Sequence, residues 1–427
     1  MNFKPTEYEL VSVATGERRP DTGGWTLEFP GEPPGLIRTD YVKKQIELHE
    51  DHEGIYRFSD WLPVKRLLKD PSSPVTYKSS GIAADLGLDN LWIIFNGWWP
   101  EIGAKMRTGT FKECEAYSVC ARMDDNFDKV LVVASAGNTA RAFARVCSDN
   151  NIPLLLFVPE QNLSSIWFES PIGSSVKLVA VGNGGDYFDS IRLSNSAVNA
   201  SGFLAEGGAK NVARRDGMAT TVISAATTIG RIPDAYFQAV GSGTGAIAAW
   251  EASLRFLEDG RFGSNKMRLM VSQNEPFIPM ADSWKADSRE FILDDDKARE
   301  EVNEILAHVL SNRRPPWGLA GGLYDALKSA GGDVLTVNNN QVLEAAQKFK
   351  DLEGSDISMA AAVAVASLYD AVKDGKVKKD EVIALNITGG GQERLKNESE
   401  IYKLQPSAVL DKNAPEEEVI KICSGLF

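Results

Sequence analysis

The sequence predicts an α/β protein with mostly parallel sheets flanked by helices. From about Lys129 onward, apolar runs of strand length alternate with segments of helical period, which is typical of a parallel sheet covered by helices. The chain has 427 residues, of which 43% are hydrophobic, so it can bury a large core. Because domains commonly contain about 100 to 200 residues, this length predicts two domains.

The expected strands are rich in Val, Ile, Leu or Phe, and most are separated by an expected helix. The strands are Lys129–Ser135, Ile152–Pro159, Ser175–Gly182, Ala235–Gly241, Met267–Glu275, Asp333–Asn339 and Glu381–Gly389. The helices are Glu113–Met123, Thr139–Asn150, Asp186–Ala200, Ala246–Leu257, Lys297–Leu310, Gln341–Leu352 and Ser358–Lys373. Residues 1–75 carry Gly and Pro clusters such as Pro30–Gly35, which predict an irregular arm that wraps a domain.

The charge balance argues against nucleic acid and membrane partners. Lys and Arg total 46 against 59 Asp and Glu, which gives a net charge of −13 and long-range repulsion of phosphate backbones and anionic lipids. Local basic groups can still bind a small anionic substrate inside a pocket. Met1–Leu10 lacks the apolar core of a signal peptide, and no apolar run approaches about 18 residues, so we expect a cytoplasmic protein.

The cysteines and histidines predict neither disulfides nor a metal site. The four cysteines contain no CxxC pair, which fits a reducing compartment. The three histidines do not form a plausible ligand set with these cysteines. We therefore expect no metal.

The turn after the strand Lys129–Ser135 is a candidate anion site. In open α/β sheets, ligands collect at the carboxyl ends of strands, where the N–H groups and the positive dipole end of the next helix face an anion such as a carboxylate. The alternative is a plain strand-to-helix turn, with a glycine for its conformation and a threonine as cap. The turn reads Ser135, Ala136, Gly137, Asn138 and Thr139.

A glycine-rich turn follows the apolar strand Ala235–Val240 and leads into a helix, so its backbone can approach a phosphate closely. Dinucleotide binding is a weaker alternative, because that pattern requires a later third glycine and an acidic residue after the next strand. The absence of a Walker lysine argues against an NTPase. The turn reads Gly241, Ser242, Gly243, Thr244 and Gly245.

Lys112 is the candidate nucleophile. It stands just before the expected helix Glu113–Met123, for which Thr108 or Thr110 could provide the cap. A cation beside the positive helix end loses its proton more easily and attacks an aldehyde better. Alone, Lys112 would be interpreted as a solvated lysine. The chain order of lysine, Asn-containing turn, glycine cradle and the late segment Thr388–Gly391 instead predicts a pyridoxal phosphate enzyme.

These segments resemble the threonine synthase family of fold type II pyridoxal phosphate enzymes, over roughly Gly54–Lys396. The motifs that carry the resemblance are "GIYRFSDWLP", "GTFKECEA", "SAGNT", "RRDGMATT" and "GSGTG". The resemblance implies that Lys112 binds the cofactor covalently, Asn138 faces its phenolate oxygen, Gly241–Gly245 hold its phosphate, and Thr388 contacts its ring nitrogen. It also implies a homo-oligomer.

The same resemblance implies an interleaved division into two domains. Residues 1–123 would form an N-terminal arm and the start of the large cofactor domain, with Lys112 near the end of this part. Residues 124–230 would form a smaller domain on the substrate side. Residues 231–427 would complete the large domain.

The lysine segment departs from the usual "NPTGSFKDRG" of the family. The stretch "FNGWWPEIGAKMRTGTFKECEA" is similar to a branch that makes cysteate from O-phosphoserine and sulfite on a route to coenzyme M. Some relatives carry cysteines in the N-terminal segment that here reads "YELVSVATGERRP", and their absence again implies no metal. Guanidinium and ammonium groups suit oxyanions. The candidate anion ligands nearest the motifs are Lys105, Arg107, Arg214 and Arg215.

The resemblance implies a β-replacement in which Lys112 takes the Cα proton of phosphoserine, phosphate leaves from Cβ and sulfite adds there. A neutral hydroxyl at Thr388 would leave the ring nitrogen unprotonated and favour β-elimination. Threonine synthase acting on O-phosphohomoserine remains an alternative, as does a pyridoxal phosphate dehydratase or lyase. A catalytically silent pyridoxal phosphate-binding protein is the alternative outside enzymes.

Overall fold

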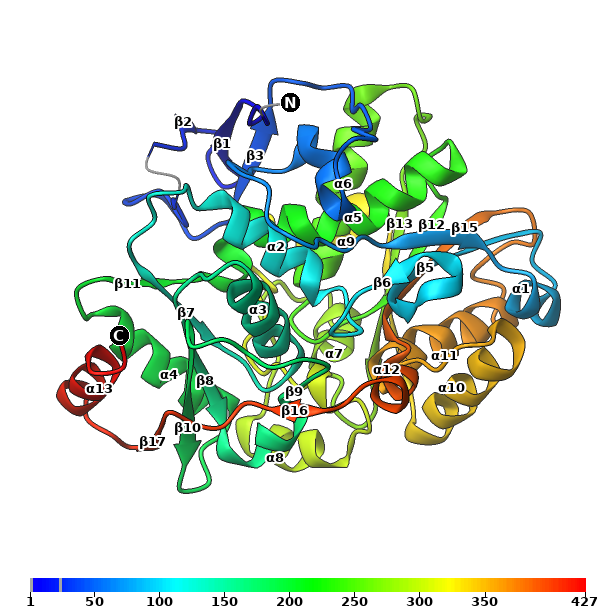
Figure 1. Cartoon of the computed structure of the whole chain (residues 1–427). Coiled ribbons are helices and arrows are strands. Elements are labelled where there is room, and N and C mark those ends of the chain that lie inside the picture. The colour runs from blue at the N-terminus through cyan, green and yellow to red at the C-terminus, as the bar shows by residue number, and fades with distance from the viewer. Residues whose placement is uncertain (1–2, 23–24) are drawn as a thin grey trace.

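A computed structural model describes residues 3–22 and 25–427 and contains two large sheets (Figure 1). The larger sheet has seven strands in the order β14-β13-β12-β15-β5-β4, with β6 paired to β5. Its strands are β4 Val75–Lys78, β5 Asn90–Trp99, β6 Ala104–Lys105, β12 Ala235–Ala239, β13 Arg268–Asn274, β14 Asp333–Val337 and β15 Val382–Gly390. Neighbouring strands are parallel except where β4 and β6 pair with β5.

The second large sheet is parallel throughout and lies on the other side of the molecule in Figure 1. Its strand order is β11-β7-β8-β10-β17. The strands are β7 Val130–Ala134, β8 Leu154–Pro159, β10 Val176–Gly182, β11 Phe203–Ala205 and β17 Ala408–Asp411. The strand β8 is buried along its whole length, as a strand covered on both faces should be.

Thirteen α-helices in the described residues connect or cover these sheets. They are α1 Gly81–Leu86, α2 Lys112–Arg122, α3 Asn138–Asp149, α4 Tyr187–Val198, α5 Val212–Ile229, α6 Thr244–Asp259, α7 Pro279–Lys285, α8 Asp295–Glu304, α9 Leu323–Ala330, α10 Asn339–Glu353, α11 Met359–Lys373, α12 Gln392–Glu398 and α13 Glu416–Ser424. Among the described helices, none combines the length and apolar character that crossing a membrane requires.

The expected alternation of strands and helices is confirmed from β7 onward, with shifts of a few residues at the ends. The expected helix Lys297–Leu310 is wrong in its second half, because α8 ends at Glu304 and a separate 3-10 turn, η5, covers His308–Leu310. Between them, Asn339 Oδ1 accepts the N–H of Leu306 at 3.1 Å, and Asn274 Oδ1 accepts that of Ala307 at 3.1 Å. These side chains take N–H groups that a continuous helix would use.

Residues 3–22 and 25–75 are more regular than expected, while residues 1–2 and 23–24 of the expected arm lie outside the described residues. The strands β1 Tyr8–Ser12, β2 Arg18–Pro20 and β3 Ile37–Tyr41 form a small antiparallel sheet, and a 3-10 segment, η1, follows at Gly54–Trp61. Leu10 and Ile37 are buried in one cluster with Val212 at the start of α5, which anchors this sheet to the body of the protein.

The C-terminal segment returns to the five-stranded sheet. The strand β17 pairs with β10, and α13 packs against α4, as the red end of the chain shows in Figure 1. Assigning all of residues 231–427 to the large domain therefore overlooks this last stretch. The remaining domain boundaries stay a prediction.

Candidate active site

Four segments far apart in the sequence meet around one cavity of about 310 Å³. Lys112 is the first residue of α2, and Ser135–Thr139 joins β7 to α3. Gly241–Gly245 joins β12 to α6, and Thr388 lies in β15. All of these residues line the cavity, so the structure brings together the predicted lysine, anion turn, glycine cradle and ring-nitrogen partner.

The Lys112 amine is surrounded by few polar groups. Its Nζ lies 3.2 Å from Glu115 Oε2 and 3.9 Å from Met218 Sδ. Burial is the main cause that lowers the pKa of Lys112 below its usual value, with Arg214 adding to the shift and Glu115 opposing it. A smaller fraction of the amine is therefore protonated at a given pH, so more of Lys112 is present as the neutral amine that can attack an aldehyde or accept a proton.

The predicted threonine cap of α2 is wrong. Phe111 occupies the cap position without a side-chain hydrogen bond. The hydroxyl of Thr108 instead donates to Glu113 Oε1 at 2.8 Å, and the same carboxylate oxygen accepts the Thr108 N–H. Glu113 therefore fixes the loop that leads to Lys112.

The glycine turn lines the cavity and leads into the start of α6. Gly243 has a φ of +76°, and a Cβ there would lie 2.7 Å from Leu323 Cδ2, so this position needs glycine for the backbone itself. A Cβ on Gly245 would lie 2.6 Å from Gln238 Nε2. Gly243 at the cap position of α6 makes no side-chain hydrogen bond, and Ser242 Oγ accepts only the N–H of Thr244, at 3.3 Å. The next N–H groups of the first turn are therefore available for a phosphate.

The donor set fits pyridoxal phosphate. The cofactor requires a lysine amine, an anion cradle and a polar neighbour for its ring nitrogen, and the cavity offers Lys112, the start of α6 and Thr388. Ser358, the cap of α11, also lines the cavity, and its N–H donates to the carbonyl of Gly389, next to Thr388, at 2.9 Å. Asn138 opens α3 on the cavity wall.

Of the four basic residues named from the sequence, only Arg214 lines the cavity. Its Nε donates to Glu206 Oε1 at 2.9 Å, and its Nη2 lies 3.2 Å from Glu115 Oε1. Arg214 comes close to Lys112 because α5 packs tightly on α2. A Cβ on Gly217 of α5 would lie only 2.3 Å from the carbonyl oxygen of Cys114 in α2.

The other three basic residues are placed elsewhere. Lys105 is exposed on β6. Arg107 is held by Glu169 Oε1 at 2.6 Å and Asp149 Oδ2 at 2.8 Å. Arg215 is buried and pairs with Glu251 Oε2 at 2.9 Å. None of the three borders the cavity, so Lys105 and Arg107 are not brought to the predicted substrate site.

Sequence reasoning missed Gln238 and Tyr187, which also line the cavity. Gln238 lies on β12 and accepts hydrogen bonds from Tyr236 and Asn386, each at 2.8 Å. Polar residues inside strands that are otherwise apolar, such as Gln238 and Asn386, were the available signal. No sequence signal identified Tyr187, since tyrosine is common at the start of an amphipathic helix.

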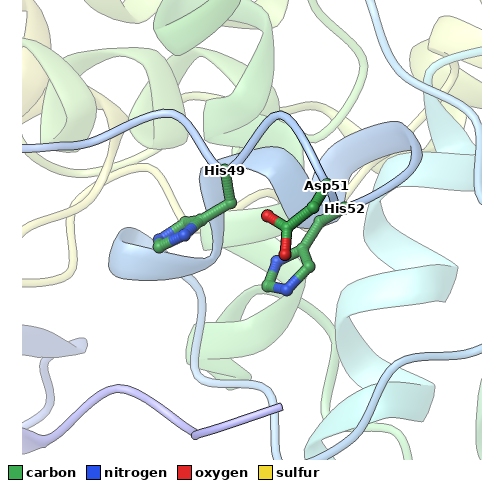
Figure 2. Close-up of side chains that lie close together, drawn as sticks. All are labelled: His49, Asp51 and His52. Atoms are coloured by element: carbon green, nitrogen blue, oxygen red, sulfur yellow. The ribbon is translucent and has the colours of Figure 1, made fainter. Parts of the chain in front are cut away.

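A group of possible metal ligands, His49, Asp51 and His52, lies on the segment that leads into η1 (Figure 2). Their ligand atoms lie within 4.8 Å of one another. Each imidazole already has a protein partner, since His49 Nε2 lies 2.9 Å from Asp60 Oδ1 and His52 Nδ1 lies 3.2 Å from the carbonyl of Tyr56. These contacts account for both rings without an ion, and we assign no metal to them.

Comparisons with known proteins agree with this geometry. Residues 104–389 match the family model described as "Pyridoxal-phosphate dependent enzyme". A cysteate synthase of Methanocella arvoryzae is 46% identical over 420 residues, which cover 97% of this chain and 99% of that protein. A cysteate synthase of Methanosarcina mazei is 46% identical over 389 residues, which cover 91% and 93%.

Solved structures share the fold at low sequence identity. Maize serine racemase is 14% identical with a TM-score of 0.56, over 74% of this chain and 89% of that one. A threonine deaminase of Solanum lycopersicum is 16% identical with a TM-score of 0.54, over 76% and 88%. The chain belongs to the fold type II pyridoxal-phosphate dependent enzymes and, within them, to the cysteate synthases.

Proposed function

We propose that the enzyme replaces the phosphate of O-phospho-L-serine with sulfite, giving L-cysteate and phosphate for coenzyme M biosynthesis. The observation that carries this proposal is a cavity bordered by Lys112, the glycine cradle and Arg214 together. An amine, a phosphate-binding helix start and a guanidinium suit an amino acid that carries one anion and exchanges it for another. The homo-oligomer expected from the resemblance is part of the proposal.

Four groups of this chain would hold the cofactor. Lys112 would bind it covalently, and the N–H groups of Gly241–Gly245 and of the first turn of α6 would hold its phosphate. Thr388 would contact the ring nitrogen, and Asn138 would contact the phenolate oxygen. When bound, the cofactor supplies the electron-withdrawing system that makes the Cα proton of an amino acid acidic.

The start of α3 would orient the substrate carboxylate. This helix also begins without a side-chain cap hydrogen bond, and the N–H of Gly137 is already taken by Ser135 Oγ at 3.1 Å. N–H groups of the first turn of α3 therefore remain available for an anion. Thr139 lines the same wall, and its hydroxyl is held by Glu115 Oε1 at 3.0 Å.

Lys112 would move the proton in both halves of the reaction. Once the amine of the substrate has displaced it, the freed Lys112 amine would take the proton from Cα, and phosphate would leave Cβ with the electron pair of the C–O bond. The sulfur lone pair of sulfite would then form the C–S bond at Cβ, and Lys112 would return the proton to Cα. Arg214 would bind the departing phosphate and the arriving sulfite, since guanidinium suits both oxyanions.

The test is incubation of purified enzyme with O-phosphoserine, with and without sulfite, while phosphate and amino-acid products are followed. We expect cysteate only when sulfite is present. More efficient formation of threonine from O-phosphohomoserine would instead identify a threonine synthase. Formation of a keto acid without sulfite would identify a dehydratase or lyase. Bound cofactor without any turnover would identify a silent binding protein.

The identity of the lysine is tested separately. Borohydride reduction should leave a pyridoxyl group on the peptide that contains Lys112, as read by mass spectrometry. A label on another lysine would contradict the assigned site.

A further inference from the structure

The buried carboxylate of Glu115 contacts several residues of the active site. Glu115 lies one helical turn after Lys112 on α2 and is fully buried. Its Oε2 lies 3.2 Å from Lys112 Nζ. Its Oε1 lies 3.2 Å from Arg214 Nη2 and accepts the hydroxyl hydrogen of Thr139 at 3.0 Å. One buried side chain therefore joins three residues that line the cavity, from α2, α3 and α5.

The helix itself does not require a carboxylate at this position. Burying an ionised carboxylate is costly unless charged or polar partners compensate it. The partners of Glu115 are cavity residues, which points to a role in the active site rather than in the core.

Arg214 is held in one orientation by two carboxylates. Glu206, which is buried, binds its Nε at 2.9 Å, and the other oxygen of Glu206 accepts the N–H of Gly208 at 3.0 Å. With Glu115 at Nη2, two of the three guanidinium nitrogens have anchors. No hydrogen bond of Nη1 is found in the described part of the chain. Arg214 lines the cavity, so its guanidinium retains one nitrogen that could bind an anion there.

We propose that Glu115 is a positioning residue that tethers Arg214 beside Lys112 and so selects substrates whose phosphate is attached to Cβ. The inference rests on the proposed function. A single carboxylate separates the lysine amine from the guanidinium. Lys112 must reach the Cα proton, so an anion held by Arg214 lies close to the reacting carbons. This spacing fits phosphoserine, whereas phosphohomoserine carries its phosphate one methylene farther away.

The decisive experiment compares the two substrates in Glu115→Gln and Glu115→Ala. We would measure kcat/KM for O-phosphoserine and the inhibition constant of O-phosphohomoserine, so that the longer compound need not react. The preference for the shorter compound should fall by about tenfold or more, the discrimination that one methylene commonly provides. The glutamine variant keeps the shape of the side chain. If the alanine variant loses its cofactor, the preference measured in the glutamine variant is the test.

Glu251→Gln is the matched control. Glu251 is also a buried carboxylate held by arginines, with Arg215 Nε at 2.9 Å and Arg38 Nε at 3.1 Å, but it does not line the cavity. This variant should keep the wild-type preference. In an Arg214→Gln background, Glu115→Gln should cause little further change in preference, because the tether would have nothing to hold.

A measurement without substrate gives a second readout. The charged groups that act on the Lys112 nitrogen are Glu115, Arg214 and Glu206. Removing the negative charge of Glu115 should lower the pKa of the Schiff base nitrogen, as read from the cofactor absorption spectrum at varied pH. If the preference stays at its wild-type value in Glu115→Gln, the inference is overturned, whether or not this pKa shifts. If the wild-type enzyme releases no phosphate from phosphoserine, the proposed function itself fails.

Discussion

At the residue scale, the chemistry depends on how easily Lys112 gives up its proton. Burial and Arg214 both lower the pKa of the amine below the usual 10.5. In cofactor-stripped protein, the rate of Schiff base formation with added pyridoxal phosphate should therefore rise with pH to a midpoint below 10.5. Initial rates followed by absorbance would show this, and a midpoint at or above 10.5 would contradict it.

The charged neighbours of Lys112 determine the direction in which a substitution should shift this midpoint. Arg214→Gln removes a positive charge, so it should raise the midpoint toward that of an exposed lysine. Glu115→Gln removes a negative charge and should lower the midpoint. Shifts of opposite sign in the two variants would separate a charge effect from a general loss of structure.

Single residues were predictable only where a local pattern identified them. Lys112 and Thr388, which both line the cavity, were singled out because each belongs to an ordered set of turns at strand ends. Among the basic residues, the sequence could not distinguish Arg214 from Lys105 or Arg107, since only the packing of α5 on α2 places Arg214 at the cavity. Arg107 has two nearby carboxylates, Asp149 and Glu169, which come from distant parts of the sequence.

At the element scale, the start of α6 can be tested with a substitution that has opposite effects on stability and on cofactor binding. Ser242 precedes the helix, and its Oγ accepts the N–H of Thr244 at 3.3 Å. Ser242→Asp places a negative charge at the positive helix end, which favours the folded protein without cofactor by about 0.3–1 kcal/mol. The same charge repels the cofactor phosphate, so cofactor affinity should fall at least tenfold, about 1.4 kcal/mol.

The neutral variant Ser242→Asn is the control for that substitution. It keeps a side chain that can cap the helix and should lose much less cofactor affinity. Thermal unfolding without cofactor and fluorescence titration with cofactor would measure the two effects. Equal affinities in the two variants would show that the phosphate does not lie at this helix start.

The elements that sequence analysis missed lack the simple patterns on which it depends. The strand β5 lies between β15 and β4, yet its apolar run contains Asn96 and Gly97. The buried amide of Asn96 donates to Asn386 Oδ1 at 2.7 Å, so a cross-strand partner compensates a polar residue that weakens the strand pattern. Most of α5 is buried, so no polar face marked its helical period.

At the scale of the whole molecule, the active-site cavity continues into a second hollow of about 620 Å³. Tyr187, His308 and Arg314 line both spaces, and Arg299 and Arg313 line the second one. These arginines come from a protein with a net charge of −13, which would otherwise repel dianions. Two of them are partly neutralised, since Arg313 pairs with Asp186 and Arg314 with Asp295, each at 2.7 Å.

This arrangement predicts that a local charge matters more than the total charge for the capture of phosphoserine and sulfite. Arg314→Gln removes a positive charge where the two hollows meet and leaves Asp295 with less compensation. We expect kcat/KM for phosphoserine to fall about threefold to tenfold at low salt, mainly through KM, because a charged cleft concentrates its substrate. The effect should shrink at high ionic strength, where the Debye length falls to about 3 Å.

Lys379→Gln changes the net charge by the same amount at a different place. Lys379 is exposed and lies 3.5 Å from Asp89, so it too belongs to a surface ion pair, but it borders neither hollow. This variant should keep the wild-type kcat/KM and its salt dependence. Equal losses in Arg314→Gln and Lys379→Gln would mean that the overall field governs capture. A loss confined to Arg314→Gln would mean that the positive charge between the two hollows offsets, at short range, the repulsion of the rest of the protein.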